Sequence, residues 1–247
     1  MMRALGLAFL LFTAFPASAQ DVPLVADLSS HLVAITTGFS GTDVLLFGAT
    51  DGPGDIAVVV RGPAKEEVVR RKGRMGPIWA NAESVIFRDV PSYYRVASSR
   101  PLGEFAPQLL LSRYQIGVDS VRMLPADENM PAEQATVFKQ ALLRLKTEDG
   151  LYDQGVADVA LMSNRLFRTQ LHFPANVPTG TYLVEVYLFR EGQITSAEIV
   201  PLTISKIGVG ADLYDFAHGK WAFFYGLLAV LLAGSAGWTA GAVFRRV

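Results

Sequence analysis

The chain has 247 residues, a formal net charge of −1 at pH 7 and no cysteine. The near-neutral balance gives no electrostatic footprint for nucleic acid, and the absence of cysteine excludes disulfides, thiolate metal sites and thiol nucleophiles. Hydrophobic residues make up 51% of the chain, above the globular norm, because both ends are apolar. The length between those ends suits one large domain or two small ones.

The first residues have the pattern of a cleaved export signal. Arg3 precedes an apolar run over residues 4–15 that is too short for a permanent span, and Ala17-Ser18-Ala19 is a small-residue cleavage site. We predict a signal peptide over residues 1–19, with Gln20 as the new N-terminus. An uncleaved anchor is the alternative. Because no cysteine follows the site, the pattern is not that of a lipoprotein.

Residues 20–100 have the pattern of short β-strands separated by turns. The strand-like runs are rich in Val, Ile and Phe, and Asp51-Gly52-Pro53-Gly54 has turn chemistry. The run AVVV at 57–60 is apolar on both faces, as expected of a central strand. This rhythm predicts a sandwich built of hairpins. The predicted strands are residues 32–36, 42–50, 55–62, 66–72 and 83–90.

Residues 101–150 change character and are predicted to form a helical insert. Residues 107–114 fit a short helix. A longer helix is predicted from Pro131 to about Thr147, because proline suits the first helical position and Gly150 follows the last turn. Residues 124–132 have the composition of a loop. The predicted apolar face of the longer helix comprises Val137, Ala141, Leu142 and Leu145, and Glu133, Lys139, Arg144 and Lys146 lie off it.

Residues 151–206 return to alternating or continuous apolar runs, so a second β region is predicted there. Within residues 181–189 both sides are mostly apolar, which predicts a strand covered on both faces. The predicted fold class is mainly β: an immunoglobulin-like or related sandwich in the periplasm with a helical insert, plus one C-terminal transmembrane helix. Two β units and one interrupted sandwich fit this pattern equally well.

A juxtamembrane linker is expected over residues 207–220, and the stretch from Trp221 to Phe244 follows with no charged residue. A bilayer core of about 30 Å needs about 20 apolar residues at about 1.5 Å each, so this stretch is long enough to span as a helix. Arg245 and Arg246 follow at once, which predicts a cytoplasmic tail over residues 245–247. The predicted topology is a single pass through the inner membrane with the bulk of the chain in the periplasm.

Small residues recur at four-residue spacing along this predicted helix. Such a stripe lets a second helix backbone approach closely, so we predict a packing surface for a multi-pass membrane protein or for another copy of the chain. The alternative is that Gly and Ala are simply common in such helices. The stripe consists of Ala229, Ala233, Gly237 and Gly241.

Several strings together resemble one known family. They are GTDVLLFGAT, VVVRGP, the WAN of residues 79–81, PSYYRVASSRPL at 91–102 and FPANVPTGTYLVEVYLF at 173–189, together with the terminal helix. The chain is similar to the alphaproteobacterial putative transmembrane protein family, over nearly all of the mature chain. The resemblance implies a signal peptide, a periplasmic region and one C-terminal span. It also implies that the protein is encoded beside anion exporters of the TauE/SafE type. The family carries no established activity and no known catalytic residues.

Motifs for catalysis, metals and cofactors are missing from the sequence. His31, His172 and His218 are far apart and form no zinc pairing, and no nucleophile elbow, P-loop or dinucleotide fingerprint is present. The glycines of GFSGTD at 38–43 fit a hairpin turn better than a phosphate cradle, because the lysine and the following helix are missing. We therefore expect no metal, no cofactor and no enzymatic activity.

One polar and aromatic cluster is suggestive. Arginine forks with hydroxyls and an aromatic wall suit an oxyanion or an acidic partner. The alternative is a solvated strand edge, where charges deter edge-to-edge pairing, with half-buried tyrosines. The cluster comprises Arg70, Arg71, Lys72, Arg74, Trp79, Asn81, Tyr93, Tyr94, Arg95, Ser98, Ser99 and Arg100.

The sequence favours a membrane-anchored periplasmic binding or accessory protein that partners a multi-pass inner-membrane protein. A self-associating protein of envelope structure or assembly is the alternative, and a periplasmic enzyme is favoured least. Nucleic acid is not an expected partner.

Overall fold

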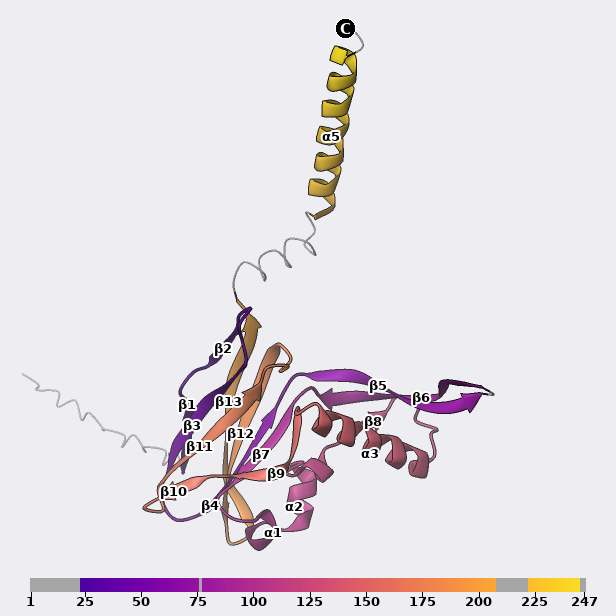
Figure 1. The fold of residues 1–247 in the computed structure, drawn as a ribbon. Helices are drawn as coiled ribbons and strands as arrows, with labels where there is room; N and C mark the ends of the chain where they lie inside the picture. The colour runs from indigo at the N-terminus through magenta and orange to yellow at the C-terminus, as the bar shows by residue number, and fades with distance from the viewer. Residues whose placement is uncertain (1–22, 76, 208–221, 245–247) are drawn as a thin grey trace, which may run out of the picture.

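A computed structural model describes residues 23–75, 77–207 and 222–244, and within them the fold is mainly β (Figure 1). The predicted signal peptide and cytoplasmic tail lie outside these residues, as does the linker beyond Ile207. Three sheets are present in the described part. Two of them enclose the main core, and the third forms an arm that projects from it.

The first sheet has four antiparallel strands in the order β1-β3-β11-β10. β11 alternates strictly between exposed and buried residues, as expected where one face meets a core and the other meets solvent. The strands are β1 (Leu24–Leu28), β3 (Gly41–Thr50), β11 (Leu166–Pro174) and β10 (Ala160–Met162).

The second sheet has six strands in the order β2-β13-β12-β4-β7-β9. Its central strands are buried on both faces: the predicted apolar run 57–60 is inaccessible, and so is most of β12, as expected from their composition. The strands are β2 (Leu32–Ile35), β13 (Gln193–Lys206), β12 (Gly180–Arg190), β4 (Asp55–Arg61), β7 (Tyr94–Ser98) and β9 (Tyr152–Asp158).

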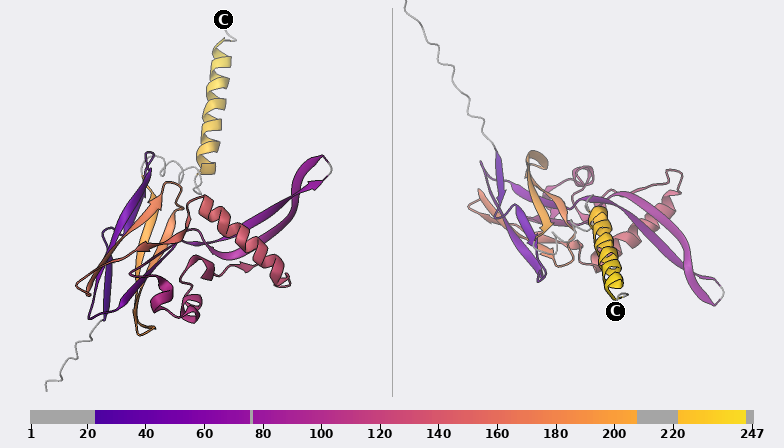
Figure 2. Two further views of the ribbon diagram at one scale, coloured as in Figure 1. Left: turned by 60° about the horizontal axis from the view of Figure 1, so that its bottom comes forward. Right: turned by 90° about the horizontal axis from the view of Figure 1, so that it is seen from above.

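Both sheets combine strands from before the helical segment with strands from after it. β3 pairs with β11 through nine residues of each strand, and β4 pairs with β12 from Arg61↔Leu183 to Asp55↔Phe189. The N-terminal and C-terminal β regions therefore share one core, which lies between the two layers visible in Figure 2.

The arm is a long antiparallel hairpin of β5 (Ala64–Met75) and β6 (Ile78–Pro91), with the short β8 (Leu124–Pro125) beside β6. The predicted strands 66–72 and 83–90 are thus parts of longer strands that pair with each other. Since the sheet order is β5-β6-β8, β5 is an edge strand in the described part of the chain. Figures 1 and 2 show the far end of the hairpin standing clear of the body.

The insert contains α1 (Leu102–Phe105), α2 (Gln108–Arg113), the 3-10 turn η1 (Val118–Ser120) and α3 (Ala132–Glu148). Both predicted helices are therefore present, with Pro131 preceding α3 as its N-cap residue. The predicted apolar face of α3 was wrong by part of a turn. Val137 and Leu145 are exposed, whereas the buried residues are Phe138, Leu142 and Lys146.

The C-terminal helix α5 (Ala222–Phe244) has 23 residues, so a helix is present where one was expected. Within residues 23–75, 77–207 and 222–244, no helix meets the combined requirement of length and apolarity for crossing a membrane. The predicted transmembrane span therefore stays a prediction.

Candidate functional site

The structure disperses the predicted polar and aromatic cluster. Six of its twelve residues gather on the arm, two tyrosines lie in the core, Arg95 and Ser98 lie on β7, and Ser99 and Arg100 lie beside Asp55 at the start of β4. The arm group comprises Arg70, Arg71, Lys72, Arg74, Trp79 and Asn81.

The cross-strand register places most of the arm group on one face. Arg74 pairs with Trp79 and Lys72 with Asn81, and partners opposite each other in an antiparallel ladder project to the same side. Arg70 lies two residues before Lys72 and shares that side, because side chains alternate along a strand. We call this surface the outer face of the arm. Trp79 is 70% exposed there.

The inner face of the arm packs on α3. Val69, Val85 and Phe87 are buried on this side, in contact with the main core. Arg71 also points inward: its Nη2 lies 2.5 Å from Oε1 of Glu83, directly opposite it in the ladder, and its guanidinium carbon lies 6.0 Å from the ring centre of Phe138. The charge of Arg71 is therefore partly compensated.

A buried ion pair fixes the helix against the hairpin. Nζ of Lys146, near the end of α3, donates to Oε1 of Glu67 on β5 at 2.5 Å. The lysine is only 8% exposed, so its charge is compensated by this carboxylate rather than by water. This contact sets the spacing between α3 and β5 at one end.

Between α3 and the free edge of β5 lies a groove of about 600 Å³. Four cationic side chains and no carboxylate line it, and its apolar surface comes from valine, alanine and phenylalanine. Val137, at 54% exposure, is its most accessible apolar residue. The lining residues are Val69, Arg70, Arg71, Lys72, Val137, Phe138, Gln140, Ala141 and Arg144. Sequence reasoning missed Arg144, which was assigned to the solvent side of the helix.

The groove combines three features that suit an extended acidic segment. Arginine and lysine attract carboxylates, the apolar surface accepts hydrophobic side chains, and the edge of β5 offers backbone groups for strand addition. Charged side chains on an edge strand also deter pairing with unrelated strands, as expected if the residues form a solvated strand edge.

Tyr93 and Tyr94 do not belong to any surface site. Tyr93 is 2% exposed and its hydroxyl donates to the carbonyl of His172 at 2.5 Å, while the Tyr94 hydroxyl donates to the carbonyl of Gln115 at 2.7 Å. Burial raises the pKa of Tyr93 to about 12 and raises the pKa of Tyr94 further. Both phenols stay neutral at physiological pH and serve the core.

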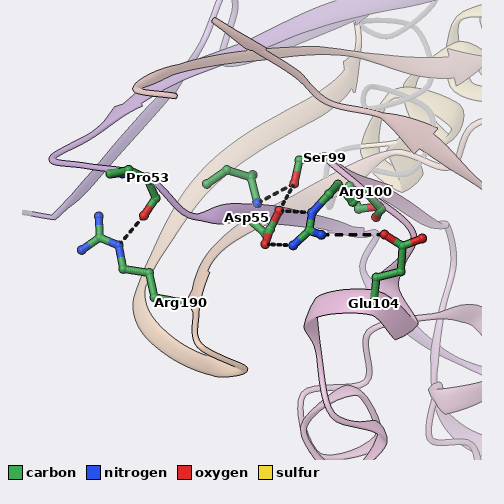
Figure 3. Close-up of polar contacts among 8 residues, drawn as sticks. Pro53, Asp55, Ser99, Arg100, Glu104 and Arg190 are labelled. Atoms are coloured by element: carbon green, nitrogen blue, oxygen red, sulfur yellow. Dashed lines mark hydrogen bonds and ion pairs between the residues drawn. The ribbon is translucent and has the colours of Figure 1, made fainter. Parts of the chain in front are cut away.

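Arg100 belongs to an ion network at the start of β4 (Figure 3). Its guanidinium donates twice to Asp55, at 2.7 and 2.5 Å, and lies 3.7 Å from Glu104. The Ser99 hydroxyl donates to Asp55 at 3.2 Å. These hydrogen bonds, chiefly that from Arg100, lower the pKa of Asp55.

A hollow of about 730 Å³ opens beside this network, between Asp55 and Arg190. Arg190 forms an ion pair with Asp51 and donates to the Pro53 carbonyl at 2.9 Å, and Figure 3 shows it aimed at the 51–54 turn. Each arginine is matched by a carboxylate, and Glu191 adds a further negative charge to the lining, so the hollow has no excess positive charge to attract an anion. We interpret the ion pairs around this hollow as structural contacts that hold the strand ends together.

The remaining predicted polar residues are structural. Arg95 lies 2.6 Å from Asp153 on β9, and the Ser98 hydroxyl donates to the Arg100 carbonyl at 2.5 Å. His31 and His172 each pair with one aspartate, Asp27 and Asp43 respectively. His218 lies outside the described residues, and the part of the chain that the structure describes holds no group of acidic and histidine side chains suited to a metal.

Sequence reasoning also missed a buried charge on the second sheet. Arg61 forms an ion pair with Glu185, and the Tyr187 hydroxyl donates to the same carboxylate at 2.5 Å. Arg61 also donates to the Tyr114 carbonyl at 2.6 Å, which ties the end of α2 to β4. The alternation of apolar residues around Glu185 gave the only signal that this carboxylate is covered.

The small-residue stripe lies along α5, where all four of its members are exposed. A methyl group added at Gly237 or Gly241 would meet no described atom within 4 Å. The stripe is therefore accessible to a second helix.

The family described as "Putative transmembrane protein (Alph_Pro_TM)" matches residues 23–246. No curated protein matches the chain.

Proposed function

The chain belongs to the family described as "Putative transmembrane protein (Alph_Pro_TM)", and from that premise we propose that it is a membrane-anchored accessory protein of the bacterial periplasm. Its mainly β body, an immunoglobulin-like sandwich, would lie outside the inner membrane, with the C-terminus in the cytoplasm. The uncharged stretch 221–244, helical over Ala222–Phe244, and the arginines that follow it support this topology.

The proposed role is to bind a multi-pass inner-membrane protein through the groove between β5 and α3. The observation that carries the proposal is the lining of this groove: four cations, an apolar surface and the edge of β5, with which no second strand of the described ranges pairs. An acidic periplasmic segment of the partner would satisfy all three. An anion exporter of the TauE/SafE type is the specific partner that the family resemblance suggests. We propose no catalytic role.

Site-specific photocrosslinking in cells tests this role. A crosslinker at Val137, inside the groove, is expected to capture a polytopic membrane protein. A crosslinker at Leu109, which is exposed on α2 away from the groove, serves as the control. Arg144→Glu should abolish the Val137 product, because it reverses one of the four charges. If Val137 captures no more than Leu109 does, the groove is not a docking site.

Self-association is the second candidate, and the open stripe on α5 favours it. Gly237→Leu should weaken whichever helix contact exists, whereas Val230→Leu, off the stripe, should not. Crosslinking through the helix then separates the two candidates. A product between two copies of the chain supports an envelope structural or assembly role, and a product with a polytopic protein supports the accessory role. Carbonate extraction of the protein from membranes would contradict both.

A further inference from the structure

The outer face of the arm carries a second feature, which shares Arg70 and Lys72 with the lining of the groove. Arg70, Lys72 and Arg74 lie on it in succession, and Trp79 stands directly across from Arg74 near the hairpin end. Val68 and Ile86, which pair on the same face nearer the body, are 48% and 43% exposed. A large aromatic side chain so exposed, on an element that stands clear of the body, requires an explanation other than core packing.

The charge on this face has one sign from Val68 to the hairpin end. Among the described residues, Arg70 and Lys72 form no ion pair with a carboxylate, and Glu83, the nearest acidic residue of β6, points to the inner face toward Arg71. The exposed residues that pair with this row across the ladder are uncharged, namely Asn81, Ser84 and Ile86. The outer face is therefore cationic and apolar together.

We propose that the outer face of the arm lies against an anionic phospholipid surface. Tryptophan prefers the interface between headgroups and acyl chains, because its ring is apolar and its N–H needs a polar partner. Arginine and lysine extend their apolar stems along such a surface and place their charges at the phosphates. A hairpin that projects from the body can reach a bilayer without moving the core.

A protein partner would fit the same face less well. Arg70 and Lys72 also line the groove, but Arg74 and Trp79, near the end of the hairpin, do not belong to its lining. What the outer face offers is an exposed tryptophan and the exposed pair of Val68 and Ile86 beside a row of cations, which matches the layered chemistry of a bilayer interface. The contact would hold the body at a fixed height and leave the groove open at the side.

The three tryptophans of the chain make the test direct. The full chain with Trp221→Phe and Trp238→Phe keeps Trp79 as its only indole reporter. It is reconstituted in vesicles of phosphatidylcholine alone and in vesicles that also contain phosphatidylglycerol. We expect the Trp79 emission to shift to the blue and to be quenched by brominated acyl chains in the anionic vesicles, and to return toward the value in water at high salt.

Charge reversal supplies the matched control. Arg70→Glu, Lys72→Glu and Arg74→Glu together should abolish the shift and the quenching. The same three reversals at Arg113, Arg122 and Arg168, which are exposed elsewhere, should leave both unchanged. Trp79 emission that stays water-like in anionic vesicles overturns the proposal. So does shielding of Trp79 found only in native membranes, because that outcome assigns the face to a protein.

A second reporter keeps this result separate from the proposed function. A chain whose only tryptophan is Trp238, on α5, reports insertion of the helix in the same vesicles. If Trp238 is quenched and Trp79 is not, the anchor stands and the arm contact fails. If Trp79 is quenched and Trp238 is not, the arm contact stands and the proposed anchor fails. Docking in the groove is measured through Val137 in a chain that keeps Arg70 and Lys72, because these two residues line both surfaces.

Discussion

Nζ of Lys146 lies 2.5 Å from Oε1 of Glu67, and this contact joins the end of α3 to the edge strand that borders the groove. Removing one partner leaves a poorly hydrated charge behind, so Glu67→Ala should lower the free energy of unfolding by about 1–3 kcal/mol, less than for a fully buried pair because Glu67 is partly exposed. Replacing both residues, as Glu67→Leu with Lys146→Met, should recover most of the loss. Urea unfolding of the single and double variants measures this coupling, and equal losses in both would show that the pair itself contributes little.

Gly48 illustrates how closely β3 is packed. A methyl group at this position would lie 2.3 Å from Cζ of Phe167 and 2.3 Å from the carbonyl oxygen of Val25. We expect Gly48→Ala to destabilise the fold by about 1–3 kcal/mol, since the neighbouring backbone cannot give way. Gly103→Ala, with open space around it, is the control and should change stability little. Thermal unfolding of the two variants compares them, and equal melting temperatures would contradict the packing described.

Alkaline pH should destabilise the protein through its buried tyrosines. Burial raises the pKa of Tyr93 from 10.0 to about 12, so between these pH values the unfolded chain releases the phenolic proton while the folded chain keeps it. Stability is therefore intact below pH 10 and falls above it, by up to about 1.4 kcal/mol per pH unit for each such tyrosine. Tyr94, Tyr152 and Tyr182 have pKa values raised in the same direction by burial.

Denaturant unfolding at a series of alkaline pH values measures this slope. Tyr93→Phe should cost about 1 kcal/mol at neutral pH, where its hydroxyl donates to His172, and should make the alkaline decline shallower. An unchanged slope would show that Tyr93 ionises as freely in the folded protein as in the unfolded chain.

Acidic pH should weaken the ion network of Asp55 and Arg100 at the start of β4. The hydrogen bonds from Arg100 and Ser99 lower the pKa of Asp55 from 3.8, so its contribution to stability is present above that value and is lost as the pH falls through the lowered pKa. Asp55→Asn should therefore destabilise the protein at neutral pH and differ less from the parent in acid. Glu128→Gln, in the exposed loop before α3, should show no such convergence. If the stability of Asp55→Asn and that of the parent run parallel across this pH range, the ion network does not contribute as described.

Much of the fold follows from local patterns in the sequence. The run 57–60 predicts a central strand because four consecutive apolar residues need cover on both faces, and β4 has it. The orientation of α3 did not follow, because Lys146 lies in the interior only by virtue of Glu67, 79 residues away along the chain. Helical periodicity treats a lysine as exposed and has no means of seeing such a partner.

The candidate site was predictable in part for the same reason. The cations of β5 and the Trp79-Asn81 segment are joined by a tight hairpin, so proximity in sequence became proximity in space. Tyr93 and Tyr94 are also close in sequence, yet they point to opposite sides of a sheet that is covered on both. One contacts Phe173 of the facing sheet, and the other contacts the segment after α2. The position of Arg144 in the groove depends on how α3 packs beside β5, which the local sequence pattern does not reveal.

The interleaving of distant strands dictates when the body can form. β3 pairs with β11, and β4 pairs with β12. A nascent chain that ends within the helical segment can therefore form neither of these two ladders. Such a chain exposes apolar strand edges until residues 166–190 are synthesised, and pairing across so long a loop is slow. Assembly of the body must therefore wait until these residues are available, and a holding chaperone would have a lengthy interval in which to act.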